Sequence, residues 1–513
     1  MVDSIEYYVK QLNLLNQIGV ALSAEKDTNV LLEKILLGAK QLTNADGGTI
    51  YLVKHDTLEM KIVRTDSLDY AMGGTTGNPI SLSPIELFNS DGSRNISTVV
   101  SNVFHSGTAI NIPDAYESSD YDFSGTYRFD KSTGYKSVSF LTIPLRNHED
   151  DIIGILQLIN PLNSETNEIM GFSSQQQELV ESLSSQAATA LTNRILVDDM
   201  KRLFDSMVKM LADTIDEKSE HTGNHCRQIP ILTEMIARAI NDTNNTYFDE
   251  YKFSDDDLYE LEVASWLHDC GKLTTPDKIL EKGAKLEKPI DRIENVRLRM
   301  EIIKRDILLN GGAEGWGDNK IQQIDDDMSF VERLNKGAEF VSEEDISRLN
   351  RLNERYSFMM SGSEQPLLDE DEMHHLSIRK GTISEEERKV INNHINVTIN
   401  MLESLPFPKH LKNVPEYAGG HHERIDGKGF PKGLLRDEMS VASRLMAVAD
   451  IFEALTASDR PYKAPLKLSK VISIMQGMMN SGHIDPDIFD VFIEQGVHLK
   501  YAKEFLRDDQ IDI

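Results

Sequence analysis

The chain has 513 residues, more than one ordinary hydrophobic core organises, so two or three domains are expected. Its composition, 40% hydrophobic and 27% charged, is typical of a globular protein, and no apolar run of about 18 residues suggests a membrane helix. The net charge of −30 argues against nucleic-acid binding and against binding to anionic membranes. Because Met1-Val2-Asp3-Ser4 lacks a signal-peptide pattern, a cytoplasmic location is expected.

The first part of the chain is predicted to be an α/β domain with flanking helices, over residues 1–195. A helical pattern covers residues 5–37, and strand-like apolar runs are found at residues 48–53, 139–145 and 152–160. Residues 68–134 are rich in Gly, Ser, Asp and Asn, which predicts loops around a pocket.

A long helix is predicted to connect this domain to the rest of the chain, over residues 175–215. From Ser173 to Leu211 apolar residues recur at three- and four-residue steps, and no Gly or Pro interrupts them before Gly223. Such a helix commonly forms a dimer seam that transmits a signal, so we expect a homodimer. Packing of the helix within a domain core is the alternative.

The remainder, residues 200–513, is predicted to be an all-α helical bundle. Within it, residues 281–380 carry the charge patterns of helices at 291–306 and 343–359 but no catalytic cluster. We interpret this stretch as an insertion and its His374-His375 pair as solvent-exposed. The cysteines, Cys226 and Cys270, imply no disulfide framework and are interpreted as buried packing residues.

The adjacent pair His268-Asp269 is the most informative feature of the sequence. Ser254 with Asp257 three residues later predicts the start of the helix that leads to this pair, and Gly271 predicts its end. A buried carboxylate beside a histidine needs a compensating charge, and Asp269 is suited to bridge two metal ions. Further metal-capable side chains lie at His221, His225, His394, His421, His422 and Asp450.

Taken singly, each of these residues is more often a surface or packing residue than a ligand. Together they form the ligand inventory of a site for more than one metal ion, and such sites most often hydrolyse phosphate esters. The Gly-punctuated segment at residues 419–431 is interpreted as presenting its histidines on a backbone that a substrate can approach closely. Because the net charge repels anions, Lys272, Arg460 and Lys463 are expected to supply local positive charge.

At roughly residues 200–465 the sequence resembles the HD-GYP family of metal-dependent phosphodiesterases, which hydrolyse cyclic dinucleotides, chiefly cyclic di-GMP. Several motifs carry the resemblance in the family's order: His225-Cys226-Arg227-Gln228-Ile229, His268-Asp269 with Gly271-Lys272, His394, the segment from His421 to Pro431, and the run from Ala449-Asp450 to Arg460-Pro461-Tyr462-Lys463.

The resemblance implies roles for individual residues. It implies that metal is held by His225, His268, Asp269, His394, His421, His422 and Asp450, and that phosphate is contacted by Lys272, Arg460 and Lys463. Phe430 stands where the family motif has tyrosine. It lacks the hydroxyl but keeps an aromatic face for the substrate. His221 stands where members with three metals carry glutamate. Two or three divalent ions, iron or manganese, are therefore expected.

Residues 20–195 resemble a GAF sensory domain. The stretches Asn44-Ala45-Asp46-Gly47-Gly48-Thr49, 129–134 and 154–160 carry this resemblance. Of the signature found in GAF domains of cyclic-nucleotide phosphodiesterases, Asn160 and Phe172 fit, whereas Pro161, Gln176 and Gln177 replace charged members. The domain is thus expected either to bind a small ligand of open identity or to serve in dimerisation alone.

The predicted function is metal-assisted hydrolysis of a cyclic dinucleotide to linear dinucleotide or GMP, regulated by the GAF domain, with Asp269 and Lys272 as catalytic residues. Cyclic di-GMP and mixed cyclic GMP-AMP are not distinguished. The alternative is a catalytically inactive cyclic-dinucleotide receptor that signals through the dimeric helix. A nucleotidase of the wider HD superfamily would explain His268-Asp269 but not residues 421–431.

Overall fold

The computed structural model describes residues 2–218, 225–249, 251–280, 282–310, 316–337, 339–457 and 465–513. The chain divides into two compact units, Met1–Leu203 and Phe204–Ile513. Within the described part, none of the helices combines the length and apolarity that a bilayer crossing requires.

The first unit is built on one antiparallel sheet. Along its path the strands follow the order β3 (Tyr70–Gly73), β2 (Thr57–Thr65), β1 (Ala45–Lys54), β7 (Ile152–Pro161), β6 (Phe140–Arg146) and β5 (Ile110–Ile112), and β4 (Ile85–Glu86) pairs with β2. The strands predicted at residues 48–53, 139–145 and 152–160 correspond to β1, β6 and β7. The predicted α/β class of this unit is confirmed.

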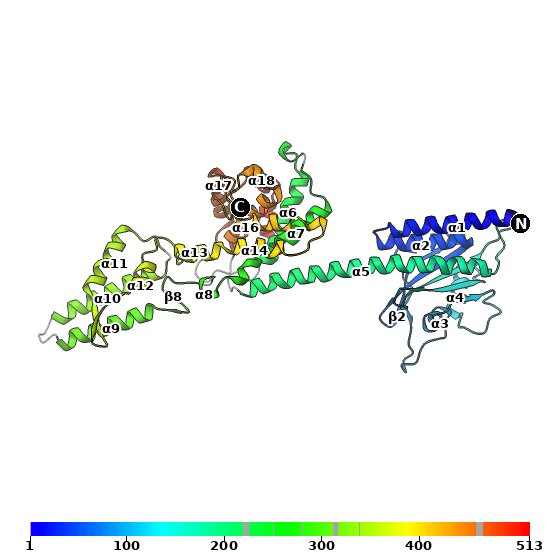
Figure 1. The fold of residues 1–513 in the computed structure, drawn as a ribbon, viewed down its shortest axis with the longest axis horizontal. Helices are drawn as coiled ribbons and strands as arrows, with labels where there is room; N and C mark the ends of the chain where they lie inside the picture. Colours follow the sequence, from blue (N-terminus) through cyan, green and yellow to red (C-terminus); the bar gives the residue numbers. More distant parts are fainter. Residues whose placement is uncertain are drawn as a thin grey trace. The chain divides into compact units, whose positions relative to one another are not determined.

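Helices cover both faces of this sheet (Figure 1). One face carries α1 (Val2–Ser23), α2 (Thr28–Thr43) and the first part of α5, and the other carries α3 (Val99–Ser106) and α4 (Ser124–Thr133). Small residues on β1 let α2 pack closely, because a Cβ on Gly48 would lie 2.7 Å from Leu36 Cδ1. Residues 68–134 are more ordered than the loops predicted for them, since they contain α3, α4, β3, β4 and β5.

Helix α5 (Ser174–Lys218) is 45 residues long, as the uninterrupted apolar periodicity predicts. Its first part is buried against the sheet through Val180, Leu183 and Leu191. Further along, a second row of apolar side chains is 49–70% exposed, at Leu196, Met200, Leu203, Met207 and Met210. The row is spaced by four and three residues in turn, the pattern of a coiled-coil seam.

The second unit is predominantly helical, as predicted. Its main core combines α6 (His225–Asp242), α7 (Asp255–Leu267), α14 (His394–Glu403), α15 (Val414–Gly419), α16 (Val441–Thr456), α17 (Leu468–Asn480), α18 (Pro486–Glu494) and α19 (Val497–Phe505). Shorter elements join them, namely η2 (Thr246–Phe248), η3 (Cys270–Thr274), α8 (Asp277–Leu280), α13 (Glu385–Asn392), η4 (Lys409–Leu411), η5 (Arg436–Glu438) and η6 (Asp508–Gln510).

The stretch predicted as an insertion has a hydrophobic cluster of its own, which runs from Leu286 to Leu376. It contains α9 (Ile293–Asn310), α10 (Trp316–Asn335), α11 (Glu343–Arg355), α12 (Glu370–Leu376), and the hairpins β8 (Glu287–Lys288) with β9 (Ile290–Asp291) and β10 (Ser357–Met360) with β11 (Ser363–Pro366). The helix predicted at residues 343–359 therefore ends earlier, where the chain turns into β10. The prediction that both adjacent histidines are exposed is wrong for His375, whose Nδ1 lies 2.7 Å from the Asp371 carbonyl oxygen in a buried position.

Candidate metal centre

The His268-Asp269 pair follows directly after α7. Ser254 begins this helix with a capping box to Asp257, as predicted, and the helix ends at Leu267. Gly271 is not the helix stop that we expected. A Cβ at this position would lie 1.9 Å from the His394 carbonyl oxygen, so the glycine lets η3 contact the start of α14.

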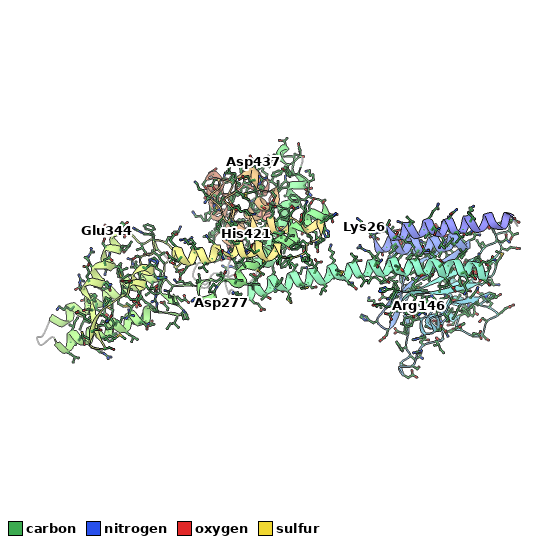
Figure 2. The ribbon with its side chains drawn as sticks, viewed as in Figure 1. Lys26, Arg146, Asp277, Glu344, His421 and Asp437 are labelled. Atoms are coloured by element: carbon green, nitrogen blue, oxygen red, sulfur yellow. The ribbon has the colours of Figure 1, made fainter. Side chains whose placement is uncertain are left out.

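Seven of the side chains that sequence analysis selected converge in the second unit, and His421 marks their position in Figure 2. They come from five places in the chain: His225 begins α6, His268 and Asp269 separate α7 from η3, His394 begins α14, His421 and His422 follow α15, and Asp450 lies in α16. Their ligand atoms form overlapping groups suited to hold metal, namely His225/His268/Asp450, His394/His421/His422 and His268/Asp269/His421.

Asp269 lies between the first two of these groups. Its Oδ2 is 3.5 Å from His225 Nε2 and 3.3 Å from His268 Nε2, whereas its Oδ1 is 3.3 Å from His394 Nε2. Asp269 Oδ1 and His394 Nε2 are buried and make no hydrogen bond among the described residues. Leaving such atoms unsatisfied is costly, so this arrangement fits a carboxylate that bridges two cations.

The imidazole rings are oriented by backbone carbonyl groups. The Nδ1 atoms of His268, His394 and His421 lie 2.7, 2.5 and 2.6 Å from the carbonyl oxygens of the residues three positions earlier, Ser265, Ile391 and Ala418. A donating Nδ1–H fixes the tautomer in which Nε2 carries a lone pair. In each case this leaves Nε2 as the ligand atom.

Glu453 is a functional candidate that the sequence analysis missed. Its buried carboxylate contacts His225 Nδ1, as backbone carbonyl oxygens contact Nδ1 of His268, His394 and His421. His225 Nε2 then lies 3.2 Å from Asp450 Oδ1. Glu453 follows Asp450 by three residues on α16 and therefore shares its helix face, which is the signal that sequence analysis could have used.

Electrostatics hold most of the centre in ligand-competent protonation states. Burial lowers the pKa of His421 well below its usual value and lowers that of His422 to about 4, and neighbouring histidines contribute at both rings. Burial opposes ionisation of Asp269, but Lys272 and His268 outweigh it and hold the pKa of this carboxyl well below its ordinary range. Neutral imidazoles beside an ionised carboxylate are the forms that bind divalent metals.

His225 differs from His421 and His422 in the direction of its pKa shift. Burial lowers its pKa, but Asp269, Asp450 and Glu453 outweigh that effect and raise the pKa well above the usual value. The carboxylates around His225 thus favour a positive charge at this place. A divalent cation would supply that charge in place of a proton.

The remaining predicted site residues are placed as follows. Lys272 Nζ lies 2.6 Å from Asp269 Oδ2, so its ammonium contacts this carboxylate. The ring of Phe430 lies 4.9 Å from that of His422. His221, Arg460 and Lys463 lie outside the described residues.

Part of the segment at residues 419–431 has a structural role, carried by Glu423 and Arg424. The buried carboxylate of Glu423 accepts hydrogen bonds of 2.6, 3.2 and 3.0 Å from the backbone N–H groups of Lys432, Gly433 and Leu434. Arg424 binds Asp426 through two hydrogen bonds. These contacts fold the turn back on itself and hold the two histidines that precede it.

Both cysteines, Cys226 and Cys270, are free and buried, as predicted. Burial raises the pKa of each thiol. A thiol that stays protonated is a poor metal ligand. They therefore act as packing residues beside the centre.

Comparison with known protein families gives one match within each unit. The GAF domain family matches residues 27–191, and the HD domain family matches residues 371–488, which include His394, His421, His422 and Asp450. A solved GAF domain from an Acinetobacter phosphoenolpyruvate-protein phosphotransferase is 14% identical, with 37% of this chain and 98% of that chain covered and a TM-score of 0.28.

Curated relatives resemble parts of the second unit. A 3′3′-cGAMP-specific phosphodiesterase of Vibrio cholerae is 44% identical over 80 residues, 16% of this chain and 18% of the relative. A cyclic di-GMP phosphodiesterase of Pseudomonas aeruginosa is 43% identical over 74 residues, 14% of this chain and 17% of the relative. A second 3′3′-cGAMP-specific enzyme of Vibrio cholerae is 20% identical over 299 residues, 58% of this chain and 36% of the relative.

The chain thus spans well under half the length of each of these relatives. Their names nevertheless agree with the motifs and with the convergence of histidines and carboxylates around Asp269. The chain thus has one region similar to the GAF domain family and another similar to the HD domain family.

Proposed function

We propose that this protein is a metal-dependent phosphodiesterase that hydrolyses a cyclic dinucleotide to the linear dinucleotide, to GMP, or to both. The observation that carries the proposal is the position of Asp269, with one carboxylate oxygen toward His225 and His268 and the other toward His394. Two divalent ions, iron or manganese, would occupy the two sides of this carboxylate, because a set rich in histidine suits such metals.

The residues of the centre have separate roles in this proposal. His225, His268 and Asp450 would hold one ion, His394, His421 and His422 would hold the other, and Asp269 would contribute to both sites. Metal ions bound here would make water nucleophilic at neutral pH and would neutralise phosphate charge. Lys272, which contacts Asp269, adds positive charge beside the phosphoryl oxygens, and Phe430 offers an aromatic face to the substrate.

The names of the relatives support a cyclic dinucleotide as substrate, since they include both cyclic di-GMP and 3′3′-cGAMP phosphodiesterases. Arg460 and Lys463 are proposed as further phosphate contacts from their places in the motif. His221 is proposed as the ligand of a third ion, if one binds.

We further propose that residues 1–195 act as the sensory domain, that residues 175–215 relay the signal, and that residues 200–513 carry the hydrolase. The exposed apolar row from Leu196 to Met210 supports a homodimer through α5. At the end of this helix, Lys218 Nζ donates hydrogen bonds to the Leu273 and Thr275 carbonyl oxygens at 2.7 and 2.8 Å. These bonds join α5 to the turn that follows Asp269, which gives a small ligand or dimerisation in the GAF domain a physical route to the centre.

Replacing Asp269 by asparagine tests the proposal, because the amide keeps the volume but not the bridging charge. Manganese-loaded protein should convert cyclic di-GMP or 3′3′-cGAMP to linear product, and Asp269→Asn should abolish conversion while its circular dichroism spectrum stays unchanged. Asp437→Ala, an exposed carboxylate of η5 labelled in Figure 2, is the control and should keep full activity. Full turnover by Asp269→Asn would refute the assignment, and ligand binding without product by the unaltered protein would favour the receptor alternative.

A further inference from the structure

A hollow of about 340 Å³ lies beside the metal centre, on the side of His394. Its lining residues are Thr274, Thr275, Lys389, Val390, Asn393 and His394, from η3, the turn that follows it and the α13–α14 segment. None of its residues other than His394 belongs to the metal-binding groups. The volume suits a part of a nucleotide ligand rather than a whole dinucleotide.

Lys389 is the only cationic side chain in the lining of this hollow. It is exposed, and no ion pair or hydrogen bond of its ammonium is found among the described residues. On its own helix, Glu386 pairs with His374 at 3.5 Å and Glu387 with Lys282 at 2.7 Å. The third acidic residue, Glu385, forms no ion pair with Lys389 in the described part of the chain. In a chain with a net charge of −30, a lysine without an acidic partner beside the centre is available to an anion.

The walls of the hollow are fixed by contacts behind them. The pair between Glu387 and Lys282, whose ammonium is fully buried, holds the first turn of α13 to the residues that lead into the insertion. On the opposite wall, Thr274 Oγ1 donates to the Gly271 carbonyl oxygen at 2.9 Å. Because its walls are held in place by these contacts, the hollow is preorganised, and a ligand would bind with a smaller entropic cost.

A cyclic dinucleotide closes two phosphodiester groups into one ring, so only one of them can be at the metal centre at a time. The other needs a cation of its own. Lys272 contacts Asp269, and Lys272, Arg460 and Lys463 are proposed above for phosphate contacts, whereas the Lys389 ammonium has no such role. We infer that the hollow beside His394 is the subsite for the second, non-reacting phosphate, with the Lys389 ammonium and the Asn393 amide as its contacts. This inference rests on the proposed substrate class. It adds two binding residues that lie next to the base of the insertion.

Three variants of the manganese-loaded 513-residue chain test the subsite. Lys389→Ala should raise the KM for cyclic di-GMP and the Kd for its hydrolysis-resistant bis-phosphorothioate analogue about fivefold, the effect of one exposed charged contact. Hydrolysis of bis(p-nitrophenyl) phosphate, which has a single phosphodiester, should be unchanged. Lys389→Arg should restore affinity, and Arg388→Ala, a cation on the same helix outside the lining, should leave it unaltered.

The outcomes separate this inference from the proposed activity. If Lys389→Ala and Arg388→Ala have the same KM and Kd, the subsite is refuted even where linear product forms. If the unaltered protein forms no product but binds the analogue in a Lys389-dependent way, the hydrolase proposal fails and the subsite stands. If it neither binds the analogue nor forms product, both are refuted.

Discussion

Replacing Gly271 with alanine is expected to disrupt the metal centre without removing any ligand. The added Cβ would lie 1.9 Å from the His394 carbonyl oxygen and 2.8 Å from Thr398 N, and both neighbours are backbone atoms that cannot rotate away. Ordinary van der Waals contact begins at 3.4 Å, so the two segments must separate by about 1.5 Å. Separation also strains the hydrogen bond of 2.9 Å from Gly271 N to Thr398 Oγ1.

The cost can be estimated from these contacts. Overpacking of this kind costs about 1–3 kcal/mol, and loss of one hydrogen bond about 1 kcal/mol. His394 moves with α14, and its Nε2 now lies 3.3 Å from Asp269 Oδ1. A displacement of about 1 Å at a catalytic centre can cost about 100-fold in rate.

Urea unfolding, metal content by elemental analysis and turnover of cyclic di-GMP together test this expectation. Gly271→Ala should lose stability, metal and turnover together. The control is Gly477→Ala inside α17, where an added Cβ has no neighbour within 4 Å, and there alanine should stabilise the helix by about 0.5–1 kcal/mol. A Gly271→Ala protein with unchanged stability and metal content would show that the contact between η3 and α14 does not organise the centre.

Further predictions concern three other places in the chain. Glu453→Gln should weaken metal binding about 10- to 100-fold, because His225 loses its anionic partner, and retention of full metal content by elemental analysis would contradict this. Leu203→Glu should convert a dimer into a monomer in analytical ultracentrifugation, because it places charge in the exposed row of α5; an unchanged mass would argue against that seam. Burial lowers the pKa of His498, so the unfolded chain binds more protons below about pH 6.5 and stability falls as pH falls through that value. His498→Gln should therefore lose less unfolding free energy than the unaltered protein between pH 7.5 and 5.5 in urea titrations, and equal losses would refute this.

Features that depend on neighbours in sequence were predictable. The Ser254 capping box needs only Asp257 three residues later, and the length of α5 follows from its uninterrupted periodicity. The pair at His268 was found because a carboxylate beside a histidine at an inward helix end is chemically conspicuous. In these cases the physical cause lies within a few turns of the chain.

Features that depend on tertiary contact were missed or assigned a different role. The partner of His225 is Glu453, which is 228 residues away, and no local pattern connects them. Gly271 is a residue type that commonly ends helices, but here its lack of a side chain lets α14 pack closely against η3. Glu423 follows two histidines in the sequence and resembles a site residue. Its carboxylate instead accepts hydrogen bonds from backbone N–H groups of the turn that follows. Such roles are set by which surfaces meet after folding.

The central claim is that Asp269 bridges two metal ions, and anomalous X-ray diffraction from crystals of protein purified without chelators tests it most directly. The account predicts two anomalous peaks in the second unit, one among His225, His268 and Asp450 and the other among His394, His421 and His422, with an Asp269 oxygen next to each. A single peak, or two peaks of which one is remote from Asp269, would contradict it.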